Sequence, residues 1–491
     1  MRVALIAVSV FVLINHFTTA QIVATKKSEN TFINFLGKSD SLFWVAEDEY
    51  INSYDFDLNL KSSNKIQGGL DDDYTNAVFF NSRILIIEKD TKHSKKLFAI
   101  KKTIFWNGES NDSLIKIFHI DGWEEHFNLK SEGYKFYFRF STTRHNLLFV
   151  YENDYKHDSD NVIKVRVLNK DDELSPIRLL RIPYDRKLTK ISNLVFDDSN
   201  GEKVITLLTH YDVASRNKRR AIRTELLEFD LISPGNRKVE MPVYSNYISS
   251  KAKYVNGKWV YCFLKSDSAL TRITGLGFVT YDGSAEIMGD VQFGDSLSIK
   301  KNFWNYFFNS HDLNYLLGHI DTYTLREIQP ISDNRILAII EKDYSRVSIS
   351  TSPDGAGGVP NGVFANDILV SLFDVSKRSG LTYPIRKKQF FASKDFISYL
   401  LLTQNSKANL VFSDDDPKAD FTERHYKQNN YLINDSVVQA SVSNFTNDFF
   451  TGNRLYRFQT KSFVMLNDST FVIAATVKRK EAYLLKVNLA N

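Results

Sequence analysis

Short apolar runs recur along the whole chain, and each is bounded by Asp, Asn, Ser or Gly. Runs of this length between turn-forming residues are typical of β-strands, and the longer period of an amphipathic helix is nearly absent. The eight clearest runs are Leu42–Val45, Ile84–Ile87, Leu147–Tyr151, Val204–Leu208, Trp259–Leu264, Ile336–Ile340, Leu410–Phe412 and Phe471–Ala475. They lie roughly 40 to 80 residues apart, a spacing that predicts one unit of several strands repeated along the chain.

Two segments far apart in the chain repeat one another closely. Asn81–Asp90 (NSRILIIEKD) is echoed by Asn334–Asp343 (NRILAIIEKD) with a one-residue gap, and Leu147–Asp154 is a looser third copy. In each copy an apolar strand runs into a charged turn, and a second strand follows, as at Val162–Leu168. The repeat predicts an antiparallel hairpin that recurs with loops of variable length.

Units of four antiparallel strands need about 40 to 50 residues each, and placing them radially leaves only short protected edges. We therefore predict an all-β fold, with a single β-propeller-like domain of about 7–8 blades over residues 25–491. Two packed β-sandwich domains are the alternative, because sandwiches also consist of short strands with frequent turns. No linker rich in Pro, Gly and Ser divides the chain as two tandem sandwiches would require.

The first twenty residues have the three parts of a secretory signal: Arg2, an apolar stretch from Val3 to Ile14, and small residues at Thr18 and Ala20. We expect a signal peptide at residues 1–20 that is removed before Gln21, and hence a secreted or periplasmic protein. A membrane anchor is the alternative, but this apolar stretch falls short of the roughly 20 residues that cross a bilayer. No later apolar run reaches that length, so no membrane span is expected.

Composition and charge exclude several classes of protein. The 491 residues are 43% hydrophobic and 25% charged, as in ordinary folded domains, and 63 Lys+Arg against 58 Asp+Glu give no electrostatic case for nucleic acid. The single cysteine, Cys262, excludes an intrachain disulfide, and its apolar neighbours predict a buried side chain rather than a nucleophile. An exported chain without disulfides favours a Gram-negative bacterial source over an animal one.

If the source is eukaryotic, four asparagines become candidate N-glycosylation sites. Asn111, Asn434, Asn444 and Asn467 each begin an N-x-S/T sequon, so they would be N-glycosylation sites in a eukaryotic secretory pathway. Sequons also arise by chance in chains rich in Asn and Ser, so they do not identify the source.

Three acidic clusters offer the oxygen ligands that calcium accepts, at Asp71–Asp73, Asp197–Gly201 and Asp414–Asp416. None has the spacing of an EF-hand loop, and Asp is also a common turn former. We therefore predict no cofactor and no metal-binding residue, and calcium stays open only where loops of different blades converge.

Two further segments interrupt the strand pattern. Five cations gather at Arg216–Arg220 and Arg223, which fits either a solvated hairpin tip or a site for a polyanion such as a surface polysaccharide. Thr351–Gly362 is the only run dense in Gly and Pro, and it fits a hairpin insertion or a binding loop.

Aromatic residues gather in two places. Phe303–Leu317 is the best candidate for a helix, because aromatic residues pair there at i,i+4. Tyr134, Phe136, Phe138 and Phe140 alternate along a strand, which predicts a face buried against a neighbouring sheet.

No nucleophile elbow, phosphate-binding loop, dinucleotide fingerprint or zinc pattern occurs in the chain. The densest titratable group is His119–His126 (HIDGWEEH), whose carboxylates are of the kind that hydrolyse glycosides. Sequence neighbours seldom have the separation that this reaction needs, so we predict no catalytic and no cofactor-binding residue.

One C-terminal pattern resembles a family. It consists of a strand ending in Asp, an Ile-x-Lys-x-Gln turn and an apolar strand closing on acidic residues, at Asn366–Asp374, Ile385–Gln389, Ser398–Tyr399 and Asn409–Lys418. This pattern is similar to that of uncharacterised exported β-propeller-like proteins of Gram-negative bacteria, from which the chain departs at Lys388 and at Asp414–Asp416. The resemblance implies export and a propeller-like fold, and it implies no activity.

The sequence thus predicts a secreted binding or scaffolding module whose ligand is a glycan or a protein. A secreted hydrolase acting on polysaccharide or peptide is one alternative, and a surface adhesion or assembly component is another. The sequence indicates no oligomeric state.

Overall fold

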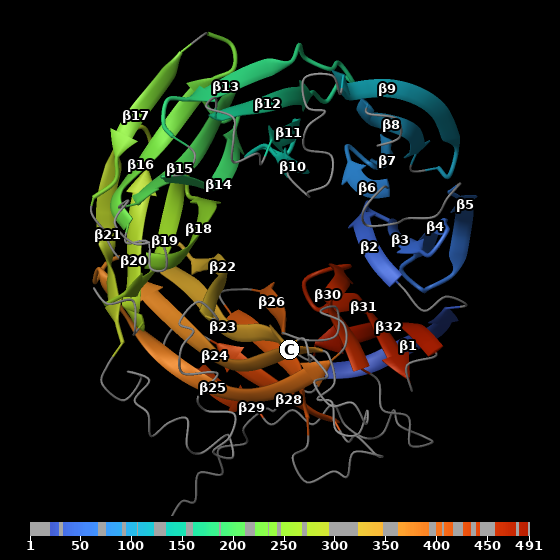
Figure 1. Cartoon of the computed structure of the whole chain (residues 1–491). Helices are drawn as coiled ribbons and strands as arrows, with labels where there is room; N and C mark the ends of the chain where they lie inside the picture. The colour runs from blue at the N-terminus through green and yellow to red at the C-terminus, as the bar shows by residue number, and fades with distance from the viewer. Residues whose placement is uncertain are drawn as a thin grey trace, which may run out of the picture.

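The described strands form eight four-stranded antiparallel sheets, which are arranged as blades around a central axis (Figure 1). The computed structural model describes residues 20–28, 33–66, 75–90, 95–105, 107–121, 134–153, 161–185, 188–211, 221–233, 235–242, 247–267, 273–293, 323–346, 362–391, 399–404, 407–415, 426–433, 438–441, 457–477 and 481–489. None of these residues is helical, so none belongs to a helix able to cross a membrane. The architecture is an eight-bladed β-propeller, which confirms the predicted fold class; the alternative of two packed sandwiches is wrong.

The first four blades follow one another in chain order. Their strands are β2 (Ile33–Lys38), β3 (Leu42–Glu47), β4 (Tyr50–Asp55) and β5 (Leu60–Lys65); β6 (Thr75–Phe80), β7 (Arg83–Asp90), β8 (Lys95–Phe105) and β9 (Ser110–Asp121); β10 (Tyr134–Phe140), β11 (Leu147–Asn153), β12 (Asn161–Leu168) and β13 (Arg178–Ile182); β14 (Thr189–Asp197), β15 (Lys203–Tyr211), β16 (Ala221–Asp230) and β17 (Asn236–Glu240).

The last four blades complete the ring, and the eighth includes the first described strand, β1. Their strands are β18 (Tyr247–Val255), β19 (Lys258–Ser266), β20 (Ile273–Tyr281) and β21 (Ala285–Gln292); β22 (Tyr323–Ser332), β23 (Arg335–Arg346), β24 (Gly362–Asp374) and β25 (Ser379–Phe391); β26 (Leu400–Gln404), β27 (Lys407–Asp415), β28 (Tyr426–Ile433) and β29 (Val438–Ser441); β30 (Arg457–Met465), β31 (Thr470–Val477), β32 (Glu481–Leu489) and β1 (Ala20–Ser28).

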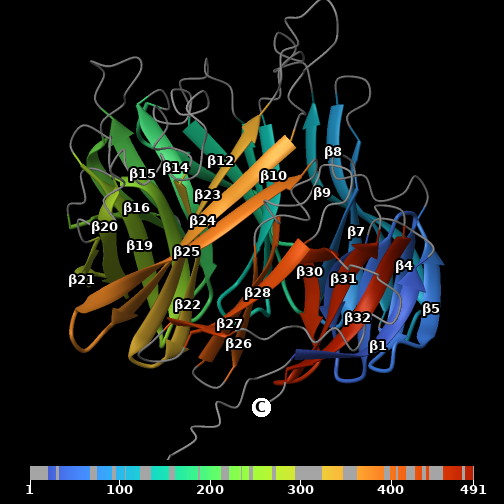
Figure 2. The same cartoon turned by 90° about the horizontal axis from the view of Figure 1, so that it is seen from below.

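In blades 1 to 7 the first strand of the sheet in chain order lies nearest the axis, and in blade 8 this place is taken by β30, with β1 at the opposite edge of the sheet (Figure 1). We call β2, β6, β10, β14, β18, β22, β26 and β30 the inner strands. The space that they surround is the centre of the ring. Seen from the side, most strands run obliquely or steeply between the two faces of the ring (Figure 2). The inner strands are therefore the elements that a ligand at the centre of the ring would meet.

The core is divided into eight apolar clusters, and each one lies between two neighbouring blades. The second strand of a blade supplies residues to both of its interfaces. In β19, Val260, Cys262 and Leu264 pack towards blade 6, whereas Tyr261 and Phe263 pack towards blade 4. Because such a strand is buried on both faces, its sequence is a continuous apolar run rather than an alternating one. The eight runs found in the sequence are the second strands of the eight blades.

Cys262 is fully buried in the interface between blades 5 and 6, as predicted. Burial raises the pKa of its thiol well above the ordinary value, because the protein interior disfavours a thiolate. A thiol held neutral and out of reach of solvent is a poor nucleophile. Its role here is to fill space.

The first and last described strands close the ring. β1 pairs antiparallel with β32 along its whole length, and Lys27 Nζ lies 2.9 Å from Glu481 Oε1. Glu47, buried in blade 1, accepts a hydrogen bond of 2.8 Å from Ser28 Oγ and one of 2.6 Å from Tyr54. These contacts join the closing strand to blade 8 on one side and to blade 1 on the other.

Two local predictions are settled by the strands. Phe136 stacks on Phe98 and Phe149 in the interface between blades 2 and 3, so the predicted burial of this aromatic face is confirmed there, although Phe140 at its end is exposed.

The turn expected at Ile385–Gln389 is wrong. This segment lies inside β25, where the register against β24 shifts at a bulge and Lys387 becomes buried.

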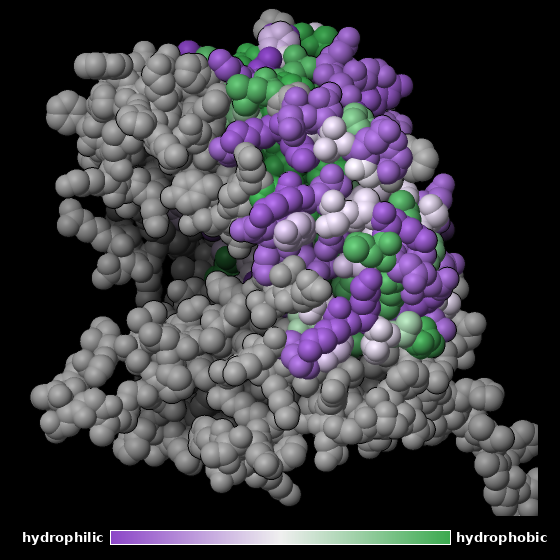
Figure 3. Space-filling model, turned by 90° about the vertical axis from the view of Figure 1, so that its right-hand side faces the viewer, coloured by the Kyte–Doolittle hydropathy of each residue, from purple (hydrophilic) through white to green (hydrophobic). Residues whose placement is uncertain are grey.

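Hydrophilic residues predominate on the described part of the outer face in Figure 3, with small hydrophobic groups among them. Tyr50, Leu60 and Leu114 are the large apolar side chains exposed on blades 1 and 2. Single exposed apolar residues of this kind are normal for a protein surface.

Candidate functional site

Two of the four sequon asparagines fall on described residues, and both are exposed. Asn111 lies in β9 at the rim of blade 2, and Asn467 lies in the turn between β30 and β31. The side-chain oxygen of Asn467 accepts hydrogen bonds from the backbone N–H groups of Ser469 and Thr470, at 2.9 and 2.8 Å, so this asparagine shapes its own turn. Asn434 and Asn444 lie outside the described residues.

The acidic turn Asp197–Gly201 connects three blades. Asp198 in blade 4 accepts hydrogen bonds from Thr142 Oγ1 at 2.7 Å, from the backbone N–H of Thr143 at 2.9 Å and from Asn146 Nδ2 at 3.2 Å, all in blade 3. Asp197 accepts one of 2.9 Å from the indole N–H of Trp259 in blade 5. The carboxylate oxygens that calcium would need are thus engaged by donors of the protein.

Other sequence candidates fall mainly outside the described residues. Asp71–Asp73, Asp416, residues 216–220, 303–317 and 351–361, and residues 122–126 of the HIDGWEEH segment are among them. Arg223, the described member of the basic run, lies 3.0 Å from Glu225 and donates to the hydroxyl of Tyr184. Within the described ranges no group of three His, Cys, Asp or Glu residues is placed to hold a metal ion.

A buried His–Glu pair lies at one end of blade 4. His210 Nε2 is 3.4 Å from Glu225 Oε1, and its Nδ1 is 3.2 Å from Thr189 Oγ1. Burial lowers the pKa of His210, and the charges of Arg223 and Lys238 add to this, while Glu225 acts against it. Both ring nitrogens face side chains of the same blade, so the pair ties strands together and presents no base to a ligand.

A different group of charged residues gathers at the centre of the ring. It consists of Arg139 of β10, Lys251 and Lys253 of β18, and Arg326 and Glu327 of β22, and we call it the inner-wall cluster. These residues come from inner strands that are separated by long stretches of chain. They are far apart in the sequence and come together only when the blades are arranged in the ring.

Three successive inner strands carry β-bulges beside this cluster. The register shifts at Asn193 and Leu194 in β14, at Ile248 in β18 and at Arg326 in β22. A bulge leaves a residue unpaired with the neighbouring strand and turns its side chain in a new direction. Asn193 takes up the required backbone conformation with a positive φ of 48°, which Asn tolerates better than most residues.

Hydrogen bonds between blades fix the inner strands at these bulges. Arg139 Nε donates to the carbonyl of Leu194 at 3.2 Å, and Asn193 Nδ2 donates to Ser250 Oγ at 2.7 Å. On the other side of β18, the backbone N–H of Leu325 donates to Ser249 Oγ at 3.2 Å. β10, β14, β18 and β22 are thereby linked in series, and the cluster stands on a rigid wall.

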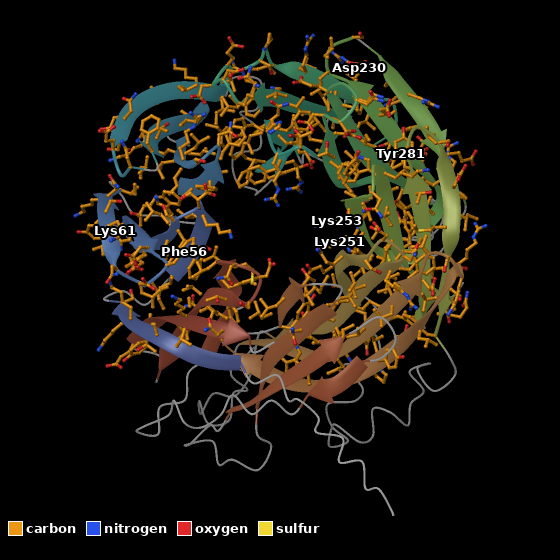
Figure 4. The ribbon with its side chains drawn as sticks, turned by 180° about the vertical axis from the view of Figure 1, so that it is seen from behind. Phe56, Lys61, Asp230, Lys251, Lys253 and Tyr281 are labelled. Carbon is orange, nitrogen blue, oxygen red and sulfur yellow. The ribbon has the colours of Figure 1, made fainter. Side chains whose placement is uncertain are left out.

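Lys251 and Lys253 are exposed at the centre of the ring (Figure 4), whereas Lys61 and Asp230 lie at the rim. Among the residues that the structure describes, neither lysine makes a hydrogen bond or an ion pair, and the same holds for Glu327. Their β19 partners, Cys262 and Val260, pack towards blade 6, so both lysines project from the side of β18 that faces blade 6.

The charges of the cluster perturb one another. Partial burial lowers the pKa of Lys251, and the positive charges of Arg326 and Arg139 lower it further, while Glu327 acts against them. Burial raises the pKa of Glu327, although Lys253 and Lys251 oppose the rise. Both shifts disfavour the charged forms, which shows that these groups are neither fully hydrated nor well paired with each other. Perturbed ionisable groups cluster at functional sites, and structural networks of charges perturb them too, so these shifts support a site only together with the geometry of the cluster.

Behind the cluster, Arg326 is held by the protein. Its Nε donates to Glu341 at 3.1 Å, and Glu341 also pairs with Lys387; both Glu341 and Lys387 are fully buried. Arg139 stacks over the ring of Tyr137, 4.5 Å from its centroid. The two arginines are therefore fixed, whereas the two lysines extend freely and can reach a ligand.

An arrangement of exposed lysines beside fixed guanidinium groups attracts anions, because each added negative charge relieves the repulsion among the cations. It provides no activated nucleophile and no pair of carboxylates. The chemistry available to this cluster is therefore the binding of an anion.

No family model matches the chain, and no curated protein sequence matches it. Among solved structures it is similar to the WD40 domain of SCAP from fission yeast, over 96% of this chain and 98% of that chain, with 7% identity and a TM-score of 0.41. It is also similar to the β-propeller domain of the Trilobed protease from Pyrococcus furiosus, over 88% and 99% of the two chains, with 9% identity and a TM-score of 0.36. Similarity this distant carries no information on a ligand or an activity.

Proposed function

We propose that the chain is a secreted binding module and that it holds an anionic ligand, part of a glycan or of a protein, against the inner-wall cluster. The observation that carries the proposal is that Lys251 and Lys253 extend into the centre of the ring and make no hydrogen bond or ion pair among the described residues. Lysines whose only task is solubility are usually found on the outer surface, where water surrounds them.

Export is the second part of this proposal. β1 begins at Ala20, so cleavage before Gln21 would leave nearly the whole closing strand on the mature protein. We expect the protein recovered outside the cytoplasm to begin at Gln21. Amino-terminal sequencing of that protein tests the site, and an intact Met1 on the exported form would contradict it.

A binding panel tests the anionic ligand. The mature protein is titrated with polyglutamate, polygalacturonate, uncharged dextran and polylysine, with and without calcium. We expect the two polyanions to bind, with an affinity that falls as salt is raised because the charges are then screened. The double variant Lys251→Gln, Lys253→Gln is expected to bind them about tenfold more weakly.

The control is Lys170→Gln, which removes an exposed lysine from the turn between β12 and β13 at the rim. Its binding should equal that of the unchanged protein. Equal binding of dextran and the polyanions, or full binding by the double variant, would contradict the proposal.

A further inference from the structure

The side of β18 that faces blade 6 has a regular spacing of charge. From Ser249 to Val255 each residue of β18 pairs with one residue of β19 without a bulge, so the strand is straight there. In a straight strand, side chains two residues apart point to the same side and lie about 6.7 Å apart. Lys251 and Lys253 therefore present two positive charges at the repeat of an extended polypeptide.

Recognition of a sugar would need a different surface. Sugar rings commonly stack on exposed aromatic side chains, and β18 offers only Tyr247 and Tyr254, which are both partly buried. Tyr247 contacts the ring of Phe263 edge-on, and Tyr254 contacts Trp259 in the same way. Close by, Tyr137 is covered by the guanidinium group of Arg139. The described wall beside the lysines thus favours charge over stacking.

We propose that the ligand is an extended acidic segment of a partner protein, with Asp or Glu at alternate positions, lying along β18 at the centre of the ring, where Lys251 and Lys253 are exposed. This inference rests on the proposed function, since it specifies which anion the inner-wall cluster holds. One carboxylate meets Lys251, and the carboxylate two residues further along meets Lys253. Ser249, next in the same series, is already held by Leu325 and marks the end of the charged stretch.

Glu327 sets the strength of this binding. Its carboxylate is the acidic group of the cluster, and Lys251 and Lys253 both act on it. A bound acidic segment brings negative charge close to Glu327, and like charges at short range repel one another. Glu327→Gln removes that repulsion and should tighten binding of the segment about threefold.

The test compares two synthetic peptides of equal composition and charge. One alternates glutamate and threonine five times, and the other carries the same five glutamates in one block. Affinities are measured by fluorescence anisotropy with the mature protein, with Lys251→Gln, Lys253→Gln and Lys170→Gln, and against an oligogalacturonate of five carboxylates. Thermal unfolding confirms that each variant is folded.

We expect the alternating peptide to bind at least about fivefold more tightly than the block peptide, because only its carboxylates match the strand repeat. Lys251→Gln and Lys253→Gln should each weaken it about threefold to fivefold, which is the upper part of the range for one exposed ion pair. Lys170→Gln should leave the affinity unchanged.

The outcomes separate this inference from the proposed function. If both peptides bind equally and both depend on Lys251, the alternating register is wrong while anion binding stands. If the oligogalacturonate binds more tightly than either peptide and depends on the same lysines, the ligand is a glycan and the inference fails. If no probe binds, or if neither Lys251→Gln nor Lys253→Gln changes the affinity, the proposed function is wrong as well.

Discussion

The acidic turn Asp197–Gly201 and the inner-wall cluster are both concentrations of charge, yet the protein uses them in opposite ways. In the turn, hydrogen bonds from blades 3 and 5 occupy the carboxylates, so the charge stabilises the ring. At the inner wall, Lys251 and Lys253 remain without such partners among the described residues, and burial together with neighbouring cations disfavours the charge of Lys251 in the folded protein.

The difference shows what a charged sequence motif can and cannot indicate. Consecutive acidic residues in a short turn are close to one another before folding, and neighbouring blades then supply donors for them. The cluster exists only after strands of blades 3, 5 and 6 meet at the centre of the ring. The conspicuous motif is structural, and the inconspicuous residues are the better candidates for binding.

The largest effect should come from Asp198→Ala. It removes an acceptor used by Thr142, Thr143 and Asn146, and it should lower the free energy of unfolding by about 3 kcal/mol, because hydrogen bonds to a charged group are the strong ones. Chemical denaturation measures this loss. Asp171→Ala, an exposed carboxylate in the turn between β12 and β13, is the control and should change stability little. Equal losses in both variants would remove the contrast between the two regions.

Glu327→Gln should raise the free energy of unfolding at neutral pH, and by less than Asp198→Ala lowers it. Burial raises the pKa of Glu327, so the folded protein binds its proton more tightly than the unfolded chain does. Stability therefore falls as the pH rises from the ordinary carboxyl pKa of about 4.3 through the raised value, and the glutamine variant lacks this loss. We expect the variant to be more stable than the unchanged protein at pH 7 and not at pH 4. Thermal unfolding at the two pH values decides this, and a destabilised variant at pH 7 would show that Glu327 is well paired.

The smallest effect on stability should come from Lys251→Gln. The charge of Lys251 is disfavoured in the folded state, so its removal should leave the free energy of unfolding within about 0.5 kcal/mol or raise it slightly. Chemical denaturation and polyanion binding are measured on the same preparation. A variant that loses stability and binding together would indicate a structural lysine like Lys387.

The fold could be predicted because the second strands are exceptional. β7, β19 and β23 are buried on both faces by neighbouring blades, so their apolar runs stand out, and eight such runs indicate about eight blades. The prediction of a turn at Ile385–Gln389 was wrong, because a strand with a bulge can carry consecutive polar residues just as a turn does. In β25 one of these residues, Lys387, is buried against Glu341. A local pattern of polar residues does not distinguish a turn from a bulged strand.

The inner-wall cluster could not be predicted in the same way. β18 reads YISSKAKYV, which alternates like any half-exposed strand, and nothing in it distinguishes the centre of the ring from the rim. The signal that exists is the pair of lysines at i,i+2 on a strand preceding one of the long apolar runs. Its meaning depends on Glu327 and Arg326, more than 70 residues further along the chain, and on a ring that a local pattern does not specify.

The closure between β1 and β32 makes the ring dependent on the order in which the chain is synthesised. Lys27 and Glu481, which face each other across this pairing, are 454 positions apart, so β1 is synthesised long before the strand with which it pairs. Until β32 has been synthesised, the β1 segment lacks the strand with which it pairs, and afterwards the edge of β32 stays open to any other strand that reaches it first. Pairing of β1 with β32 within one molecule is a slow, long-range step. It therefore competes with the exchange of β1 segments between neighbouring molecules.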